Sequence, residues 1–309
     1  MTSIRANGIT IEYEDEGPRD APVILLIMGL GMQLVAWPES FCQGLIARGF
    51  RIVRFDNRDA GLSTRMPSAG SFATTAMIAR ALLGIPVKPP YALADMARDA
   101  LGLMNALKIE NAHVVGASMG GMIAQILAIE HPERVISLTS IMSTSGDRSL
   151  PGPKPKVLRA LLRPRPRRES EAVRRGVEMF RLIGGSGYPP SETELRAKVE
   201  RAVRRSYRPD GFSRQLLAIH ASPARTRMLR RIRAPTLVLH GRDDPLVPLA
   251  AGEHTAANIP GARLRAVPGM GHFLPEALVP LLVDEIAAHC ARAERGAPLE
   301  AQRAAGGSP

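Results

Sequence analysis

Residues 111–130 read NAHVVGASMGGMIAQILAIE, and the rest of the chain is organised around them. An apolar run meets Gly116-Ala117-Ser118-Met119-Gly120 and continues at helical spacing, which predicts a strand, a sharp turn and a helix. Such a turn strains the backbone of Ser118 and lifts its hydroxyl clear of both elements, so Ser118 is the candidate nucleophile. Gly116 and Gly120 are needed because side chains there would collide. The amide of Met119 begins the helix and would point at an acyl oxyanion.

Apolar runs alternate with helical patterns on both sides of this turn. The chain opens with alternating residues around Asn7-Gly8, which predict a β-hairpin. Further strands are predicted at 23–27, 51–56, 135–142, 236–240 and 263–267, and helices at 39–48, 91–108, 119–130 and 275–290. This order predicts an α/β fold with a mostly parallel sheet flanked by helices and an antiparallel edge. Functional loops should then lie at the carboxyl ends of the strands.

A change of composition divides the chain. Residues 143–233 are rich in proline and arginine and contain amphipathic helical patterns without a strand pattern. We therefore predict a core formed by residues 1–142 and 234–291, with residues 143–233 as a helical insertion. Residues 292–309 have no apolar period and are predicted to be a disordered tail.

Length and cysteine content bound the protein class. A chain of 309 residues can bury one large core. Its start is polar and its longest apolar run, 23–32, is about half of a membrane span, so we expect a soluble protein without a secretion signal or membrane insertion. Cys42 and Cys290 fall in predicted helices, where we expect reduced core thiols. These features fit the cytoplasm.

The net charge of +12 is concentrated in one segment. Residues 147–233 hold 23 of the 41 basic and 8 of the 29 acidic residues. This segment is either a solvated arginine-rich face or a site for an anion, an acidic surface or a nucleic acid. Aromatic and basic residues do not interleave there, so we expect no nucleic-acid partner.

A serine nucleophile needs a base and a carboxylate that orients the base. His272 follows the last predicted strand, and Asp243 and Asp244 follow the strand at 236–240. We assign His272 as the base and Asp244 as the acid, because the following proline favours an extended backbone at Asp244. Asp243 would then point away, and Asp147 remains an alternative acid. The other histidines are interpreted as structural or surface residues: His113, His131, His220, His240, His254 and His289.

The loop after the strand at 23–27 reads Met28-Gly29-Leu30-Gly31. Its glycines would let the backbone approach an acyl group, so the amide of Leu30 is the second candidate oxyanion donor. The same loop, with Asp56 after the next strand, imitates a dinucleotide-binding motif. Leu34 replaces the third glycine of that motif and a hairpin precedes the unit, so we reject this interpretation. No metal or cofactor is implied.

Six stretches carry a family resemblance: LLIMGLGMQLVAWP (25–38), RFDNRDAGLST (54–64), HVVGASMGGMIAQ (113–125), RLIGGSGYPP (181–190), HGRDDPLVP (240–248) and PGMGH (268–272). Together they resemble the α/β-hydrolase superfamily, and they are similar to bacterial serine esterases of the aclacinomycin methylesterase type. The resemblance implies a Ser118, His272 and Asp244 triad and a helical cap over the pocket. Many superfamily members have His-Gly where this chain has Met28-Gly29, a change that leaves the backbone donor in place.

The resemblance implies a cofactor-independent serine esterase acting on a small-molecule ester, such as the methyl ester of a bulky compound. Gly29, Met179, Phe180 and Tyr188 are the candidate pocket residues, and the glycine-rich break at 184–190 is expected to gate access. Other acyl chemistry stays open, namely thioester cleavage, perhydrolysis or C–C bond hydrolysis. A ligand receptor that keeps the triad without turnover is a further alternative.

Overall fold

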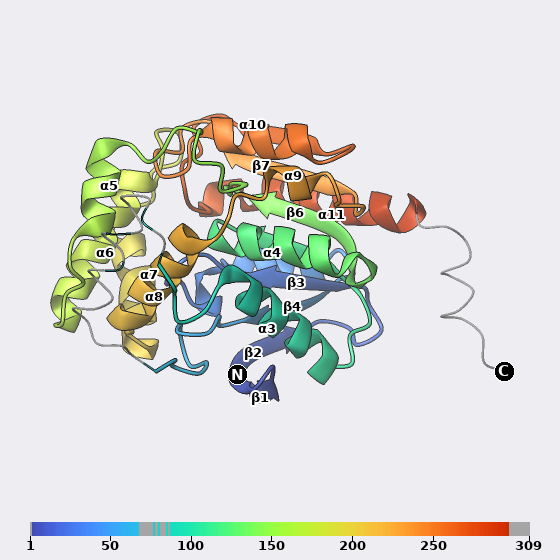
Figure 1. Cartoon of the computed structure of the whole chain (residues 1–309), viewed down its shortest axis with the longest axis horizontal. Coiled ribbons are helices and arrows are strands. Elements are labelled where there is room, and N and C mark those ends of the chain that lie inside the picture. Colours follow the sequence, from blue (N-terminus) through green and yellow to red (C-terminus); the bar gives the residue numbers. More distant parts are fainter. Residues whose placement is uncertain (1, 68–76, 78–79, 81–84, 86, 297–309) are drawn as a thin grey trace.

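A single mixed sheet organises the protein, whose computed structural model describes residues 2–67, 77, 80, 85 and 87–296 (Figure 1). The described strands are β1 (Thr2–Ala6), β2 (Ile9–Glu16), β3 (Val23–Ile27), β4 (Arg51–Phe55), β5 (Ala112–Ala117), β6 (Val135–Ile141), β7 (Thr236–Gly241) and β8 (Arg263–Val267). They pair in the order β1-β2-β4-β3-β5-β6-β7-β8. Pairing is antiparallel from β1 through β2 to β4 and parallel from β4 to β8. The predicted fold class is confirmed.

The helices connect and cover these strands. They are α1 (Glu39–Ile46), α3 (Leu93–Ala106), α4 (Met119–Glu130), α5 (Pro155–Leu162), α6 (Glu169–Ile183), α7 (Glu192–Arg205), α8 (Pro209–Ala221), α9 (Thr226–Leu229), α10 (Leu249–Asn258) and α11 (Val279–Gly296). Short 3-10 turns lie at η1 (Leu34–Ala36), η2 (Pro132–Arg134) and η3 (Glu276–Leu278). Within the described ranges, no helix is both long and apolar enough to span a membrane.

Strand β3 is apolar at every position because helices cover both faces of the sheet. In β3, Ile24 and Leu26 join a cluster with α1 and α11, whereas Leu25 and Ile27 join a cluster with α3 and α4. Successive strand residues point to opposite faces, so a continuous apolar run supplies both cores at once. All five residues of β3 are buried.

Helices α5 to α8 gather at one end of the sheet, beyond the carboxyl ends of the parallel strands (Figure 1). Apolar side chains of α6 and α7 form a small cluster of their own, which includes Val177 and Val199. By contrast, Leu229 of α9 and Ile232 pack in the main core, although both fall in the range predicted as insertion. We refer to α5–α8 as the cap.

The predicted tail starts too early. Helix α11 continues to Gly296, and Ala293 is buried in it, so residues 292–296 are helical rather than disordered. The apolar stripe of α11 reaches one turn past the last predicted helical residue, Cys290. Residues 297–309 lie outside the described residues.

Candidate active site

Strand β5 delivers Ser118 to the carboxyl edge of the sheet. Ser118 has φ 55° and ψ −119°, and its amide donates to the carbonyl of Ile141 at 2.8 Å. A Cβ atom at Gly116 would overlap the carbonyl of Gly120, and one at Gly120 would overlap the carbonyl of Ile27. The strained serine conformation therefore depends on both glycines, as steric reasoning predicts.

His272, in the loop after β8, lies between Ser118 and Asp244. Its Nε2 is 2.9 Å from Ser118 Oγ, and its Nδ1 is 2.6 Å from Asp244 Oδ2. The other oxygen of Asp244 accepts from the amides of Leu246 and Val247 at 2.9 and 2.8 Å. Both Asp244 and His272 are buried. This geometry suits Nδ1–H donating to the carboxylate while Nε2 accepts the serine proton.

The two alternative aspartates lie elsewhere. The carboxylate of Asp243 accepts from Ser186 Oγ, in the glycine-rich break that follows α6. Asp147 accepts from Ser149 and from Thr226, hydrogen bonds that lower the pKa of its carboxyl to about 2. Of the three candidates, Asp244 is the one that meets His272.

A second imidazole lies beside the same carboxylate. The Nε2 of His240 donates to the carbonyl of Val247 at 2.8 Å and lies 3.7 Å from Asp244 Oδ2. Burial lowers the pKa of His240. Its Nδ1 is buried without a hydrogen-bond partner among the described residues. The position of His240 at a strand end suggested only a structural role, and its proximity to Asp244 is a detail that the sequence did not indicate.

The Met28–Gly31 loop runs alongside the serine. A Cβ atom on Gly29 would lie 3.1 Å from Ser118 Cβ, closer than ordinary van der Waals contact, so the loop passes very close to the serine. Asn57 donates to the carbonyl of Met28 at 2.9 Å, and the amide of Gly31 donates to Gln215 of α8 at 2.7 Å. The loop is thus fixed on both sides of Leu30.

The position of the other candidate oxyanion donor, the amide of Met119, is set by helix geometry. Met119 is the first residue of α4, so the helix itself offers its amide no acceptor. It therefore remains available beside Ser118, on the same edge of the sheet as the Leu30 loop.

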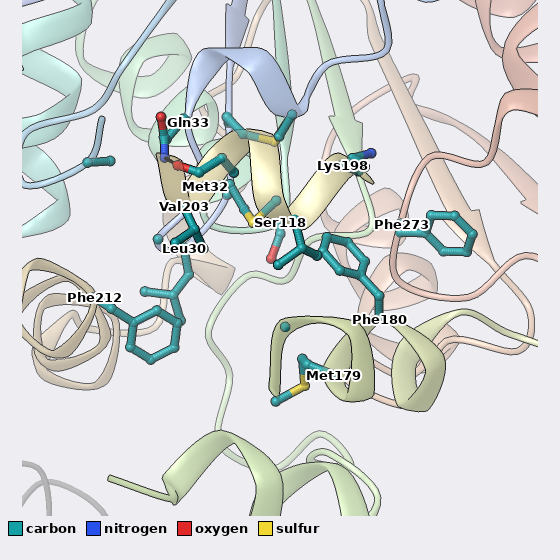
Figure 2. A pocket seen from close by; sticks show the side chains of 18 of the residues that line it. Leu30, Met32, Gln33, Ser118, Met179, Phe180, Lys198, Val203, Phe212 and Phe273 are labelled. Atoms are coloured by element: carbon teal, nitrogen blue, oxygen red, sulfur yellow. Dashed lines mark hydrogen bonds between the residues drawn. The ribbon is translucent and has the colours of Figure 1, made fainter. Parts of the chain in front are cut away.

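A cavity of about 290 Å³ opens in front of Ser118 between the sheet edge and the cap. Its walls are mostly apolar, and Figure 2 shows Leu30, Phe180 and Phe212 around the serine with Met179 on the facing cap helix. Three of the four candidate pocket residues, Gly29, Met179 and Phe180, line this cavity. The sequence did not single out Phe212 or Phe273, which also line it.

The expectation for Tyr188 is wrong. Tyr188 is absent from the cavity lining in the described part of the chain and packs against Gly269 and the apolar cluster on the α1 and α11 side. Tyr188 follows α6 by only five residues, so the sequence suggested that it would lie beside the other residues of that helix at the cavity. The chain bends at Gly184 and Gly185 has φ 79°, which takes the following residues away from the course of α6.

The glycine-rich break after α6 contacts the histidine loop, and its residues 184–190 are not part of the cavity lining in the described structure. The amide of His272 donates to the carbonyl of Ile183 at 2.6 Å, and the amide of Gly187 donates to Gly269 at 2.9 Å. A Cβ atom on Gly185 would overlap the amide of Gly271. We call residues 183–187 the strap, since they tie the cap to the backbone of His272.

Two cap arginines are neither solvated nor in the cavity. Arg214 of α8 makes two hydrogen bonds to Asp59, at 2.8 and 2.6 Å, and Arg205 of α7 pairs with Asp56 at 2.7 Å. Both aspartates lie in the loop after β4 and are fully buried. Part of the cap's positive charge therefore docks the cap on the core. The sequence had suggested only a solvated arginine-rich face or a binding site for an anion, an acidic surface or a nucleic acid.

Within the part of the chain that the structure describes, no group of three or more His, Cys, Asp or Glu side chains could hold a metal ion.

Comparisons with known proteins agree with this geometry. A sequence model of the alpha/beta hydrolase fold matches residues 22–276. Rhodomycin D methylesterase DnrP of Streptomyces peucetius is 30% identical over 305 residues, which cover 91% of this chain and 95% of the relative. A putative carbamate hydrolase, RutD of Variovorax paradoxus, is 27% identical over 263 residues, which cover 85% of this chain and 89% of that relative. The enol-lactonase structure from Burkholderia xenovorans LB400 superposes with a TM-score of 0.74 at 23% identity, over 94% of this chain and 100% of that one. The chain belongs to the α/β-hydrolase family.

Proposed function

We propose that this α/β-hydrolase is a carboxylic-ester hydrolase in which Ser118 is the nucleophile, His272 the base and Asp244 the orienting acid. The observation that carries the proposal is the continuous hydrogen-bonded chain Ser118–His272–Asp244 at the floor of an apolar cavity. A neutral imidazole in this position accepts the serine proton and so makes the hydroxyl nucleophilic.

The reaction follows from the positions of these groups. Ser118 Oγ attacks the ester carbonyl while its proton moves to Nε2 of His272, and the amides of Leu30 and Met119 stabilise the oxyanion. The alcohol leaves with the proton from Nε2. Water then gives a proton to His272 and attacks the acyl-enzyme; as the bond to Ser118 Oγ breaks, His272 returns that proton to Oγ and the carboxylic acid leaves.

The similarity to a rhodomycin D methylesterase supports a methyl ester as the group that is cleaved. Methanol is small, so the cavity volume is left for the acyl part of the substrate. Apolar walls that include Met179, Phe180 and Phe212 favour an acyl part with an apolar or aromatic body.

The test is a panel of p-nitrophenyl, methyl and aryl esters with the purified protein. Ser118→Ala and His272→Ala should each lower kcat by at least about 10⁴, and the double variant should be little worse, because the residues act as one unit. Circular dichroism should show an unchanged fold. Single variants that keep more than about a tenth of the activity would overturn the triad assignment.

The same panel separates the rival functions. A thioester and a carbamate are included, since one relative is named as a putative carbamate hydrolase. If the thioester or the carbamate is hydrolysed faster than every ester in the panel, the protein is instead a thioesterase or a carbamate hydrolase. Absence of any turnover, together with a ligand-induced rise of the melting temperature, would favour a receptor.

A further inference from the structure

The cavity wall carries three cations that form no ion pair with the described residues. Arg165, Lys198 and Arg208 line the cavity together with Ser118. Across the described residues, none of these three cations has a carboxylate within ion-pair distance, 4.0 Å. The stretch 68–86 contains neither Asp nor Glu. An enzyme for purely apolar esters would gain nothing from three unpaired cations in its pocket, because desolvating a charge costs free energy.

The other charged groups at the cavity are already matched. Arg175 pairs with Glu171, and Asp59 accepts two hydrogen bonds from Arg214 and one from the Tyr91 hydroxyl at 2.7 Å. Of the four Lys and Arg residues that line the cavity, Arg175 is thus paired within α6. Arg165, Lys198 and Arg208 are the three that have no carboxylate within 4.0 Å among the described residues.

Arg165 is the best-placed anion anchor of the three. It lies in the segment between α5 and α6, and its guanidinium carbon is 3.4 Å from the centroid of the Phe212 ring, which also lines the cavity. Its described hydrogen bond is a long one, from Nη2 to the Leu161 carbonyl at 3.5 Å. A guanidinium has five N–H donors, so most of them are left for a ligand. Burial lowers the pKa of Arg165 to about 10, which still leaves it charged at pH 7.

Lys198 of α7 adds a second positive charge. Its Nζ lies 5.7 Å from the centroid of the Phe180 ring, and burial lowers its pKa. Glu276 attracts Lys198 from beyond ion-pair distance. Aromatic rings with a cation over each offer an apolar surface for a substrate body and a charged end for an acid group.

We propose that the cavity takes esters that carry a second, ionised acid group, with Arg165 holding the carboxylate, Lys198 assisting, and the ester carbonyl at Ser118. This inference rests on the proposed function and names its substrate class, the methyl half-esters of dicarboxylic acids. Hydrolysis converts such a half-ester and water into methanol and the dicarboxylate, with release of one proton. Cationic esters of the same length are excluded by repulsion.

Three esters of one chain length test the charge preference: monomethyl adipate, dimethyl adipate and methyl 6-(trimethylammonio)hexanoate. The expected kcat/KM for the anion exceeds that for the neutral diester by about ten- to hundredfold, the range of a charge-assisted hydrogen bond. The cation should be the poorest substrate. Equal values for the three esters would overturn the inference and leave the esterase proposal standing.

Variants locate the anion site. Arg165→Met should lower kcat/KM for monomethyl adipate about ten- to hundredfold and change that for dimethyl adipate by less than about threefold. Arg167→Met, an exposed arginine two residues away, is the matched control and should change neither value. Lys198→Met should show a smaller loss of the same sign, and it replaces Arg165→Met if that variant does not fold. A proportional fall of kcat/KM for both esters would show that the residue has a structural role instead.

Binding separates failure of this inference from failure of the proposed function. Isothermal titration of Ser118→Ala should give a Kd for monomethyl adipate at least about tenfold below that for dimethyl adipate, and the added Arg165→Met change should abolish the difference. This readout requires no turnover. Equal Kd values for the two esters would overturn the proposed anion site, even if the parent protein hydrolysed every ester. Tighter binding of the anion by a parent protein that hydrolyses no ester would overturn only the proposed esterase function.

Discussion

At the scale of single residues, two adjacent aspartates serve different neighbours. Asp244 contacts His272 and accepts two backbone amides, while Asp243 reaches the other way to Ser186 of the strap. The residue after Asp244 is Pro245, which favours an extended conformation at Asp244. Adjacent side chains of an extended backbone point in opposite directions, so only one of the pair can meet the histidine.

We predict that Asp244→Asn lowers kcat by about 10⁴ with the fold intact, because an amide favours the wrong imidazole tautomer. Asp243→Asn and Asp147→Asn should stay within about tenfold of the parent, since neither carboxylate contacts His272. Steady-state kinetics on the best ester of the panel measure all three. A crippled Asp243→Asn or Asp147→Asn enzyme would reassign the acid and leave the esterase proposal in place.

At the scale of elements, the strap changes the role expected of the glycine-rich break. The carbonyl of Ile183 accepts a hydrogen bond from the backbone amide of His272. Gly185 has φ 79°, and Gly271 leaves no room for a side chain there. The break thus supports the catalytic loop, whereas its glycine content alone suggested a mobile gate.

Gly185→Ala should lower kcat at least about tenfold, because the new methyl group pushes on the loop that carries His272 and misplaced catalytic groups are costly. KM should change little, since the strap contributes only Ile183 to the cavity lining. Gly152→Ala, where a Cβ atom meets nothing within 4 Å, is the control. Parent-like kcat in Gly185→Ala, with the melting temperature also unchanged, would contradict the role of the strap.

Local pattern explains what the sequence could predict. Strands such as β3 are covered on both faces, so an apolar run marks them almost to the residue, and steric demands at Gly116 and Gly120 mark the serine turn. The place of Tyr188 and the pairing of Arg214 with Asp59 depend on contacts between segments far apart in the chain. Arginines recur throughout the cap, and helical spacing alone cannot tell which of them turn to the core, the cavity or the solvent.

At the scale of the whole molecule, buried ion pairs fasten the cap to the core. The Arg214 side chain is 1% exposed and Asp59 is fully buried. Removing one partner of such a pair leaves an uncompensated charge in the interior.

Arg214→Met should therefore lower the free energy of unfolding by about 3–5 kcal/mol, as measured by urea denaturation. Arg204→Met, whose side chain is 74% exposed and pairs with Glu200 on the same helix, should cost less than about 1 kcal/mol. Equal losses in both variants would show that the buried pair does not hold the cap.

Stability should also fall in mild acid. Burial lowers the pKa of His113 and of His289 to about 4, whereas the unfolded chain protonates histidine near pH 6.5. The unfolded state therefore binds more protons, and the stability present above about pH 6.5 is lost as the pH falls through about 4. At pH 5 the loss relative to pH 7.5 should be about 2 kcal/mol per histidine.

Urea denaturation at the two pH values measures this loss, and His289→Gln should reduce the difference by about half. The same free energy of unfolding at pH 7.5 and pH 5 would mean that both imidazoles are already accessible to protons in the folded state.

The hydrogen bond from His272 to Ile183 has a consequence for protein engineering. Recombining the core of one relative with the cap of another is an obvious route to new selectivity, but here the graft would replace the segment that positions the backbone acceptor of the His272 amide. A working chimaera must keep residues 183–187 with the recipient's histidine loop and join the foreign helices on either side of them. In this protein the natural crossover points for recombination lie inside the cap, not at its sequence boundaries.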